Sequence, residues 1–467
     1  MRLVVIGGDA AGMTVASSVR RLRDDAEIVV VERGPYTSYS MCGIPYYVGG
    51  MIDEAGDLVV RSPDEFRAQG ITVHMRCEAT AIDAGDRVVH IRDLESDEQR
   101  TEAYDTLLYA PGAHPHVPSL PGLAEHAYVV HTLDEGERLR QALDARDDVH
   151  TVAVVGAGYV GIEIAEALID RGLQVHLIEA ADQVMGMLDE DMAAELAKAL
   201  EDFGVQLHLG ERLVAVHRTD GACTQVVTDA DRYDAEAVVL AMGAKPNVDM
   251  AVEAGCEVGP SGALRVDGRM RTTVPGIWAA GDVVESRDLV AGMAVNVQLG
   301  THANKQGKVA AIDIAAYPGD GDAVFPGVVR TAVTRLCQWE VGRVGVTERE
   351  ARELGLEYAA VRFSGTARAG YMPDRGVVHV KMLAEAGTGR VLGVQLVGTG
   401  NVAKRIDVAA VWCQLGVTVQ DAQLMDLSYA PPFGGVWDLL QLAARKLTRE
   451  LGLSPQELSM LAESRVI

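Results

Sequence analysis

Cys42 is the side chain with the clearest reactivity in this chain. It lies in the segment Ser38-Tyr39-Ser40-Met41-Cys42-Gly43-Ile44-Pro45-Tyr46-Tyr47. A cysteine thiolate can attack a disulfide and form a mixed disulfide with it. A second cysteine five positions later would allow an internal disulfide, but Tyr47 stands there. If Cys42 is a redox centre, it must therefore exchange electrons with a thiol or an oxidant from outside the chain.

The local sequence favours ionisation of this thiol. A free cysteine titrates near pH about 8.5. Cys42 precedes a predicted helix that has Pro45 in its first turn, where proline is common. The positive end of that helix would stabilise the thiolate by roughly 0.3–1 kcal/mol.

The other cysteines are predicted to be inert, because free cysteines often pack as small apolar side chains. They are Cys77, Cys223, Cys256, Cys337 and Cys413. The six cysteines contain no C-x-x-C pair and no metal-ligand spacing, so we expect no bound metal. Their scatter favours a reducing compartment over a disulfide scaffold.

A full G-x-G-x-x-G sequence marks one nucleotide-binding turn. Its residues are Gly156, Ala157, Gly158, Tyr159, Val160 and Gly161. It lies between an apolar run, Thr151–Val155, and a predicted helix, Ile162–Asp170, so a pyrophosphate would sit at the helix N-terminus. Glu179 follows the next predicted strand, Val175–Ile178, where a carboxylate can bind a free ribose 2′-hydroxyl. We therefore expect NADH, with NADPH as the less favoured alternative.

A related turn opens the chain. Its residues are Gly7, Gly8, Asp9, Ala10, Ala11 and Gly12. It joins a predicted strand, Leu3–Ile6, to a predicted helix, Met13–Arg23. Asp9 replaces the middle glycine, and its role is left open. Glu32 comes twenty residues after Gly12 and matches a ribose-binding acid.

A second type of cofactor signal comes from the segment Ile277–Asp282. An aspartate after a strand and a glycine, here Asp282, can bind the ribityl hydroxyls of a flavin. Alone this pattern is as consistent with an ordinary turn, but two dinucleotide-binding units in one chain favour FAD. Further predicted cofactor contacts are Arg33, Ala79, Pro111 and Gly112.

Composition narrows the class of protein. The 467 residues allow two or three domains, and the formal net charge of −25 argues against nucleic acid or an anionic membrane as a partner. The first residues do not form a signal peptide, and no run of eighteen uncharged apolar residues occurs. We therefore predict a cytoplasmic protein.

Three segments give the chain a resemblance to a known family, the FAD-dependent pyridine nucleotide-disulfide oxidoreductases. They are the Cys42 segment above, Lys404-Arg405-Ile406-Asp407-Val408 and Tyr429-Ala430-Pro431-Pro432-Phe433. The resemblance extends from Arg2 to about Lys446. It is strongest to the single-cysteine branch, which includes coenzyme A-disulfide reductases, persulfide reductases and NADH oxidases, since the His-Pro segment of two-cysteine members is missing.

The resemblance implies roles for matching positions. Cys42 would be the redox thiol beside the flavin. Tyr371 and Tyr429 would reach the active site of the partner subunit of a homodimer, with Tyr429 donating a proton to the departing thiolate. Tyr159 and Glu163 would border the nicotinamide. Predicted contacts of the substrate, a small disulfide or persulfide such as a coenzyme A derivative, are Arg20, Arg21, Ser38, Asn304 and Lys305.

Some positions depart from this pattern or have a second interpretation. Met41 stands where the family usually has asparagine, and His302 has no familiar counterpart. Arg20 and Arg21 could equally form a solvated helix face.

The resulting architecture is α/β, with two Rossmann-like dinucleotide-binding domains and a C-terminal α+β dimerisation domain. We predict an FAD domain from residues 1–115 and 245–325 and an NAD(H) domain over 116–244. The dimerisation domain is predicted over 326–449 and a helical tail over 450–467.

Three functions remain open at this point. The first is reduction of a disulfide or persulfide by NADH, which the Cys42 segment and the Tyr429 loop favour. The second is an oxidase or peroxidase in which Cys42 cycles through a sulfenic acid. The third is a flavin redox sensor with slow turnover.

Overall fold

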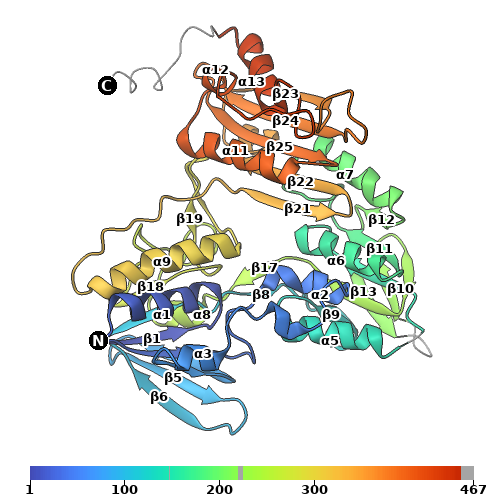
Figure 1. Cartoon of the computed structure of the whole chain (residues 1–467). Coiled ribbons are helices and arrows are strands. Elements are labelled where there is room, and N and C mark those ends of the chain that lie inside the picture. The colour runs from blue at the N-terminus through green and yellow to red at the C-terminus, as the bar shows by residue number, and fades with distance from the viewer. Residues whose placement is uncertain (147, 219–223, 454–467) are drawn as a thin grey trace, which may run out of the picture.

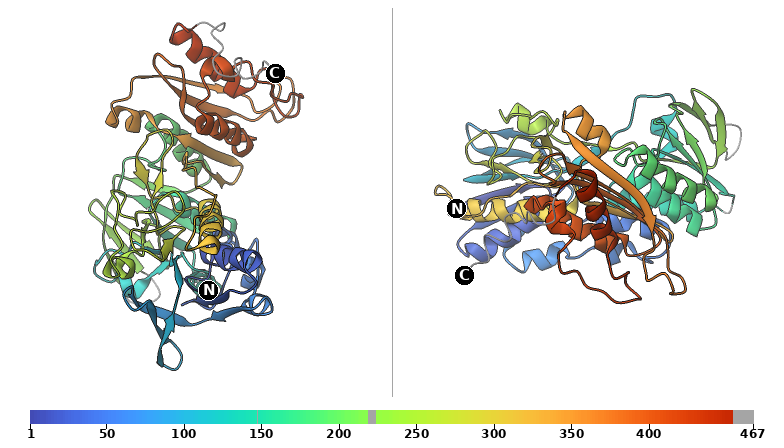
Figure 2. Two further views of the ribbon diagram at one scale, coloured as in Figure 1. Left: turned by 90° about the vertical axis from the view of Figure 1, so that its left-hand side faces the viewer. Right: turned by 90° about the horizontal axis from the view of Figure 1, so that it is seen from above.

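The structure is a computed structural model that describes residues 1–146, 148–218 and 224–453. Three sheets organise it, each with its own helices (Figure 1). The C-terminal sheet lies at one end of the molecule and the N-terminal sheet at the other (Figure 2). No described helix is both long and apolar enough to cross a membrane.

The first sheet is parallel and carries the N-terminal nucleotide turn. Its order is β18 (Ile277–Ala279), β7 (Thr106–Tyr109), β1 (Arg2–Ile6), β2 (Glu27–Val31) and β3 (Ile71–His74). The β1 residues Leu3, Val4 and Val5 are completely buried, as expected for a strand with both faces covered. Helices α1 (Ala10–Leu22) and α9 (Gly300–Ala316) pack together beside this sheet (Figure 1).

An antiparallel sheet of three strands packs with this unit. Its strands are β4 (Cys77–Asp83), β5 (Val88–Asp93) and β6 (Gln99–Ala103). β8 (Ala113–Pro115) and β17 (Ala244–Pro246) pair antiparallel where the chain enters and leaves the second unit. The predicted boundaries between the FAD and NAD(H) domains, 115/116 and 244/245, fall at this pair of strands. The exact domain boundaries remain predictions.

The second parallel sheet carries the G-x-G-x-x-G turn. Its order is β12 (Gln206–Leu209), β11 (Gln174–Glu179), β10 (Thr151–Val155), β16 (Ala237–Leu240) and β9 (Ala127–Val129). The helices of this unit are α5 (Leu133–Asp144), α6 (Tyr159–Asp170) and α7 (Glu190–Asp202). A meander of β13 (Leu213–Arg218), β14 (Thr224–Thr228) and β15 (Arg232–Ala235) completes it.

The third sheet is antiparallel. Its order is β21 (Ala332–Leu336), β22 (Trp339–Gly345), β25 (Val391–Gly398), β24 (Val378–Glu385) and β23 (Tyr358–Gly365). Helices α11 (Val402–Leu415), α12 (Val419–Ala422) and α13 (Leu439–Glu450) bury apolar side chains against it, among them Trp412 and Leu440. The predicted α+β character of this region is confirmed.

The helices that follow the two nucleotide turns begin earlier than predicted. α1 starts at Ala10 rather than Met13, and α6 starts at Tyr159 rather than Ile162. The predicted starts were wrong because the last residues of each glycine turn already form the first helical turn. At the C-terminus α13 ends at Glu450, and residues 454–467 of the predicted tail lie outside the described residues.

Candidate active site

Cys42 lies in a short turn that leads into a helix. A 3₁₀ turn, Met41–Gly43, continues into α2 (Ile44–Val48), which has Pro45 in its first turn as predicted. Of the cysteines in the described ranges, Cys42 is the exposed one, whereas Cys77, Cys256 and Cys413 are buried and Cys337 is half-buried. Cys223 lies outside the described residues. The reactive position is therefore accessible to a small molecule.

The protein around Cys42 opposes its ionisation. Partial burial and then the carboxylates of Glu163, Asp282 and Asp9 raise the pKa of the thiol. The helix that follows, α2, contains only five residues. The surroundings of Cys42 within one protomer therefore act against the stabilisation of the thiolate that was expected from the helix.

Tyr47 has a packing role at the position where a second cysteine would stand. Its side chain is only 8% exposed, and the guanidinium carbon of Arg140 lies 4.4 Å from the centre of its ring. Arg140 also donates a hydrogen bond to the Tyr47 carbonyl at 3.0 Å. Tyr47 thus connects α2 to α5, and Cys42 is left without an internal partner in its own segment.

The first nucleotide turn is shaped by glycine and by Glu32. Gly7 has φ = +100°, and a Cβ there would lie 2.1 Å from the Ala110 carbonyl oxygen. The Glu32 carboxylate accepts the backbone N–H groups of Gly8 and Gly34 at 2.6 and 2.5 Å. Burial raises the pKa of Glu32. This carboxylate therefore fixes the turn as well as lying where a ribose would bind.

Asp9 connects this turn to the segment that carries Cys42. Its Oδ1 accepts the backbone N–H of Tyr39 at 3.1 Å. Burial raises the pKa of Asp9 to about 7, and the nearby carboxylates of Glu32 and Asp282 contribute to the rise. A side chain that is neutral for part of the physiological range reduces the repulsion expected beside a phosphate.

The second turn repeats the same hydrogen-bonding scheme. Glu179 accepts the backbone N–H groups of Ala157 and Ala181 at 2.7 and 2.9 Å. A Cβ at Gly158 would meet no protein atom within 4 Å, so the glycine leaves an open approach to the helix N-terminus. The Tyr159 hydroxyl is buried and has no hydrogen-bond partner among the described residues. These features fit a pyridine nucleotide beside α6.

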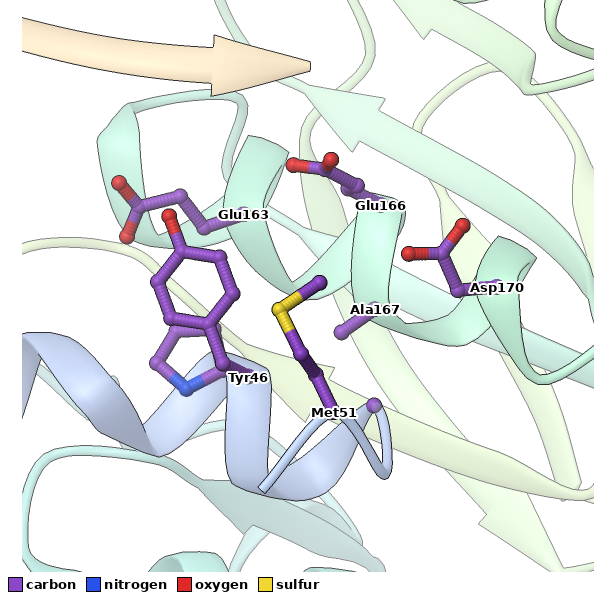
Figure 3. A pocket seen from close by; sticks show the side chains of 8 residues that line it. Tyr46, Met51, Glu163, Glu166, Ala167 and Asp170 are labelled. Carbon is purple, nitrogen blue, oxygen red and sulfur yellow. The ribbon is translucent and has the colours of Figure 1, made fainter. Parts of the chain in front are cut away.

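Glu163 joins α6 to the C-terminal sheet. The Thr334 hydroxyl donates a hydrogen bond to it at 2.8 Å, and burial raises its pKa. Figure 3 shows Tyr46 of α2 pointing toward Glu163 across a small pocket. On the next turn, Glu166 accepts the backbone N–H of Cys337 at 2.8 Å. Thr334 was missed from the sequence because nothing local indicates that its strand reaches α6.

Asp282 lies at the end of β18 in a supported turn. Burial raises its pKa to about 6. The side chain of Gln306 accepts the Gly281 N–H at 2.8 Å, and Asn296 donates to the Asp282 carbonyl at 2.8 Å. A buried carboxyl at this edge fits the predicted contact with flavin hydroxyls. Gln306 and Asn296 were missed because they come from distant segments.

The predicted substrate contacts do not all point outward. Arg20 donates hydrogen bonds to the carbonyls of Asp24, Ala26 and Gly70. Its guanidinium therefore holds neighbouring backbone segments, which fits neither the predicted phosphate contact nor the alternative of a solvated helix face. Arg21 is exposed and donates a hydrogen bond to the Ser18 hydroxyl at 3.0 Å.

The remaining predicted contacts lie on several separate segments. Asn304 and Lys305 are exposed on α9, with Asn304 accepting a hydrogen bond from Thr14 of α1. Ser38 is half-buried with φ = +49°. The other predicted cofactor contacts have these environments: Arg33 lies 3.4 Å from Glu78, Ala79 is buried in β4, and the Pro111 and Gly112 carbonyls accept hydrogen bonds from Asn247.

Tyr371 and Tyr429 come together in the C-terminal unit. Their side chains are 74% and 48% exposed, and they are hydrogen-bonded to each other. Their loops follow β23 and precede α13, at the end of the molecule remote from the first sheet (Figure 1).

Comparison with known proteins identifies the class. The family model "Pyridine nucleotide-disulphide oxidoreductase" matches residues 1–307, and the dimerisation domain of the same family matches residues 331–439. The chain belongs to this family. The predicted family, fold class and type of enzyme are confirmed, and FAD and a pyridine nucleotide are the cofactors of that class.

Similar proteins carry related names. The chain is 35% identical to the NAD(P)H coenzyme A polysulfide/persulfide reductase of Pyrococcus horikoshii over 96% of this chain and 98% of that protein. It is 34% identical to an NADH oxidase of Methanocaldococcus jannaschii over 97% and 99%. The solved structure of an NAD-dependent persulfide reductase from A. fulgidus has a TM-score of 0.92 and 37% identity, covering 97% of this chain and 84% of that one.

Proposed function

We propose that this protein reduces a small disulfide, persulfide or polysulfide with electrons from NADH, using Cys42 as its redox thiol. The observation that carries the proposal is the exposed Cys42 thiol in a segment where the buried Tyr47 occupies the position of a second cysteine. A thiol without an internal partner suits a substrate that itself provides the second sulfur. Coenzyme A compounds are the favoured class, because the name of the Pyrococcus horikoshii relative includes coenzyme A.

The cofactors would be held by the two turns already described. Glu32, Asp282 and the first turn would bind FAD, while Glu179, Tyr159 and the second turn would bind NADH. When bound, FAD supplies the means to pass an electron pair from the nicotinamide to a thiol. Glu163, held by Thr334, would border the nicotinamide side of the site.

Cys42 is the proposed nucleophile for the sulfur substrate. Its thiolate attacks one sulfur of the substrate disulfide, so the S–S bond breaks and a mixed disulfide with Cys42 forms. The other half leaves as a thiolate, which takes a proton from Tyr429. The electron pair from NADH then reduces the mixed disulfide, so that one disulfide, one NADH and one proton give two thiols and NAD⁺.

We further propose a homodimer in which Tyr371 and Tyr429 face Cys42 of the partner subunit. Both tyrosines are exposed, and their loops belong to the region that matches a dimerisation domain. A C₂ dimer would complete two such sites at once.

One assay separates this function from the alternatives. NADH consumption is measured under nitrogen with coenzyme A disulfide, with polysulfide and with neither, and the series is repeated in air. Fast anaerobic turnover with a sulfur substrate supports the proposal. Turnover in air alone would instead support the oxidase, which the similarity to an NADH oxidase makes the second candidate. Negligible turnover throughout would support a slow redox sensor.

A further inference from the structure

The side chain of Arg405 lies between the loops that carry the two exposed tyrosines. It projects from α11 and is only 7% exposed. Its Nη2 donates to the carbonyl of Ala367, shortly before Tyr371, at 3.4 Å, and to the carbonyl of Phe433, shortly after Tyr429, at 3.3 Å. One planar group therefore binds the backbone of both loops.

A half-buried carboxylate holds this guanidinium in place. Asp438 accepts a hydrogen bond from Arg405 Nε at 2.8 Å through one oxygen and caps α13 through the other, which accepts the Leu440 N–H at 2.9 Å. Asn401 assists by donating to the Phe433 carbonyl at 3.4 Å. The guanidinium is buried, so separating it from Asp438 would leave an uncompensated charge, and the arrangement resists displacement.

The loops also touch each other directly. The Ala369 N–H donates to the Pro431 carbonyl at 3.0 Å. The tyrosine side chains themselves are exposed, so little packing within the protomer holds them. Their position relative to each other therefore depends on the bond between the two phenols and on the backbone contacts that Arg405 makes with both loops.

We propose that Arg405 is a positioning residue that presents Tyr371 and Tyr429 as a pair to the Cys42 thiol of the partner subunit. The inference rests on the proposed function and assigns a task within it. A guanidinium suits this task because its donors have a fixed planar arrangement, whereas a lysine ammonium would reach fewer acceptors at once.

The first test compares Arg405→Met and Arg405→Lys with wild type in the holoenzyme. Two anaerobic rates are measured: loss of flavin absorbance on mixing with NADH, and steady-state turnover with coenzyme A disulfide or polysulfide. We expect R405M to lower kcat with the sulfur substrate roughly 10- to 100-fold. This loss is smaller than complete removal of the proton donor would cause, because R405M displaces the donor and does not remove it. Flavin reduction should change less than about twofold, since it precedes proton transfer to the leaving thiolate. R405K should recover part of kcat.

Lys381→Met is the matched control. Lys381 is also buried in the C-terminal unit, 4% exposed and paired with Asp191 and Glu348 at 2.8 and 3.1 Å, but it contacts neither tyrosine loop. This variant should lose thermal stability and keep its turnover number. Equal loss of both rates in R405M, or no loss in either, would overturn the inference.

Mixed dimers test the action across subunits. Co-expressed Cys42→Ser and Arg405→Met chains with different tags should form dimers in which one site combines an intact Cys42 with intact tyrosine loops. Only one of the two sites in each mixed dimer is intact. If half of randomly assembled dimers are mixed, about a quarter of wild-type turnover should therefore return, although each parent variant is deficient. Purified mixed dimers without recovery contradict the inference. Wild type without sulfur-dependent turnover would refute the proposed function and the inference together, whereas an active wild type with unaltered R405M refutes the inference alone.

Discussion

Tyr371 and Tyr429 share a hydrogen bond although they come from different loops of the C-terminal unit. This bond is the main cause that raises the pKa of Tyr371. The two phenols therefore form one interacting pair, and a change at one of them should affect the other.

Substitutions in this pair should show that organisation. Tyr429→Phe should lower kcat for disulfide reduction about 10- to 100-fold, because the departing thiolate loses its proton donor. Tyr371→Phe should have a smaller effect, and the double variant should be no slower than Tyr429→Phe by more than about twofold, because coupled residues are not additive. Steady-state kinetics under nitrogen measure all three, and unchanged turnover in Tyr429→Phe would remove the donor role.

Loss of the Cys42 sulfur should separate the two halves of the reaction. Cys42→Ser should lower disulfide turnover by at least about 1,000-fold, because the hydroxyl is a poor nucleophile without an activating base. The purified variant should remain yellow and should still oxidise NADH with an artificial electron acceptor. Cys337→Ser, at the other cysteine with partial exposure, is the control and should retain turnover. Full activity in Cys42→Ser would end the proposal.

The pH dependence of Cys42 should respond to Glu163. The raised pKa means that the reactive thiolate appears only at higher pH, so alkylation by iodoacetamide should accelerate as pH rises through that pKa. Glu163→Gln removes a negative charge, so the alkylation profile should move to lower pH. Glu166→Gln lies one turn further along α6 and should move it less. Equal profiles for wild type and E163Q would show that this carboxylate does not influence the thiol.

Nicotinamide specificity should follow the environment of Glu179. The carboxylate at the end of β11 favours a free 2′-hydroxyl, so wild type should have a lower KM for NADH than for NADPH. Ala180, the residue after Glu179, is exposed, so Ala180→Arg would place a cation where a 2′-phosphate could reach it. The KM for NADPH divided by the KM for NADH should then fall about tenfold, which corresponds to about 1.4 kcal/mol. Ala180→Met controls for size without charge. A lower wild-type KM for NADPH would contradict the Glu179 argument.

The nucleotide-binding folds could be predicted from sequence because their signals are local. The strand Thr151–Val155 was predicted with the bounds of β10, and Pro45 was placed in the correct turn. Glycine spacing and buried apolar runs depend on neighbours within a few residues. The starts of α1 and α6 were predicted least well, because the last residues of each glycine motif are also the first residues of the helix.

The side-chain contacts of the candidate site were harder to predict from the sequence than the nucleotide-binding folds. Thr334 meets Glu163 and Arg405 meets Asp438 through tertiary packing, which no spacing in the sequence reveals. Arg20 illustrates the opposite problem: its charge suggested a phosphate contact, while its donors are engaged by backbone carbonyls. The raised pKa of Cys42 likewise depends on burial and on carboxylates from three separate segments, neither of which the local sequence reveals.

Glu32 and Glu179 each connect the glycine turn of their own unit, through one backbone N–H group, to the loop that follows their own strand, through a second N–H group. Both glycine turns are consequently ordered before a nucleotide arrives, and little conformational entropy of these loops is lost when it binds. Replacing either acid would therefore weaken retention of its cofactor twice over, by removing the ribose acceptor and by loosening the loop that receives the pyrophosphate.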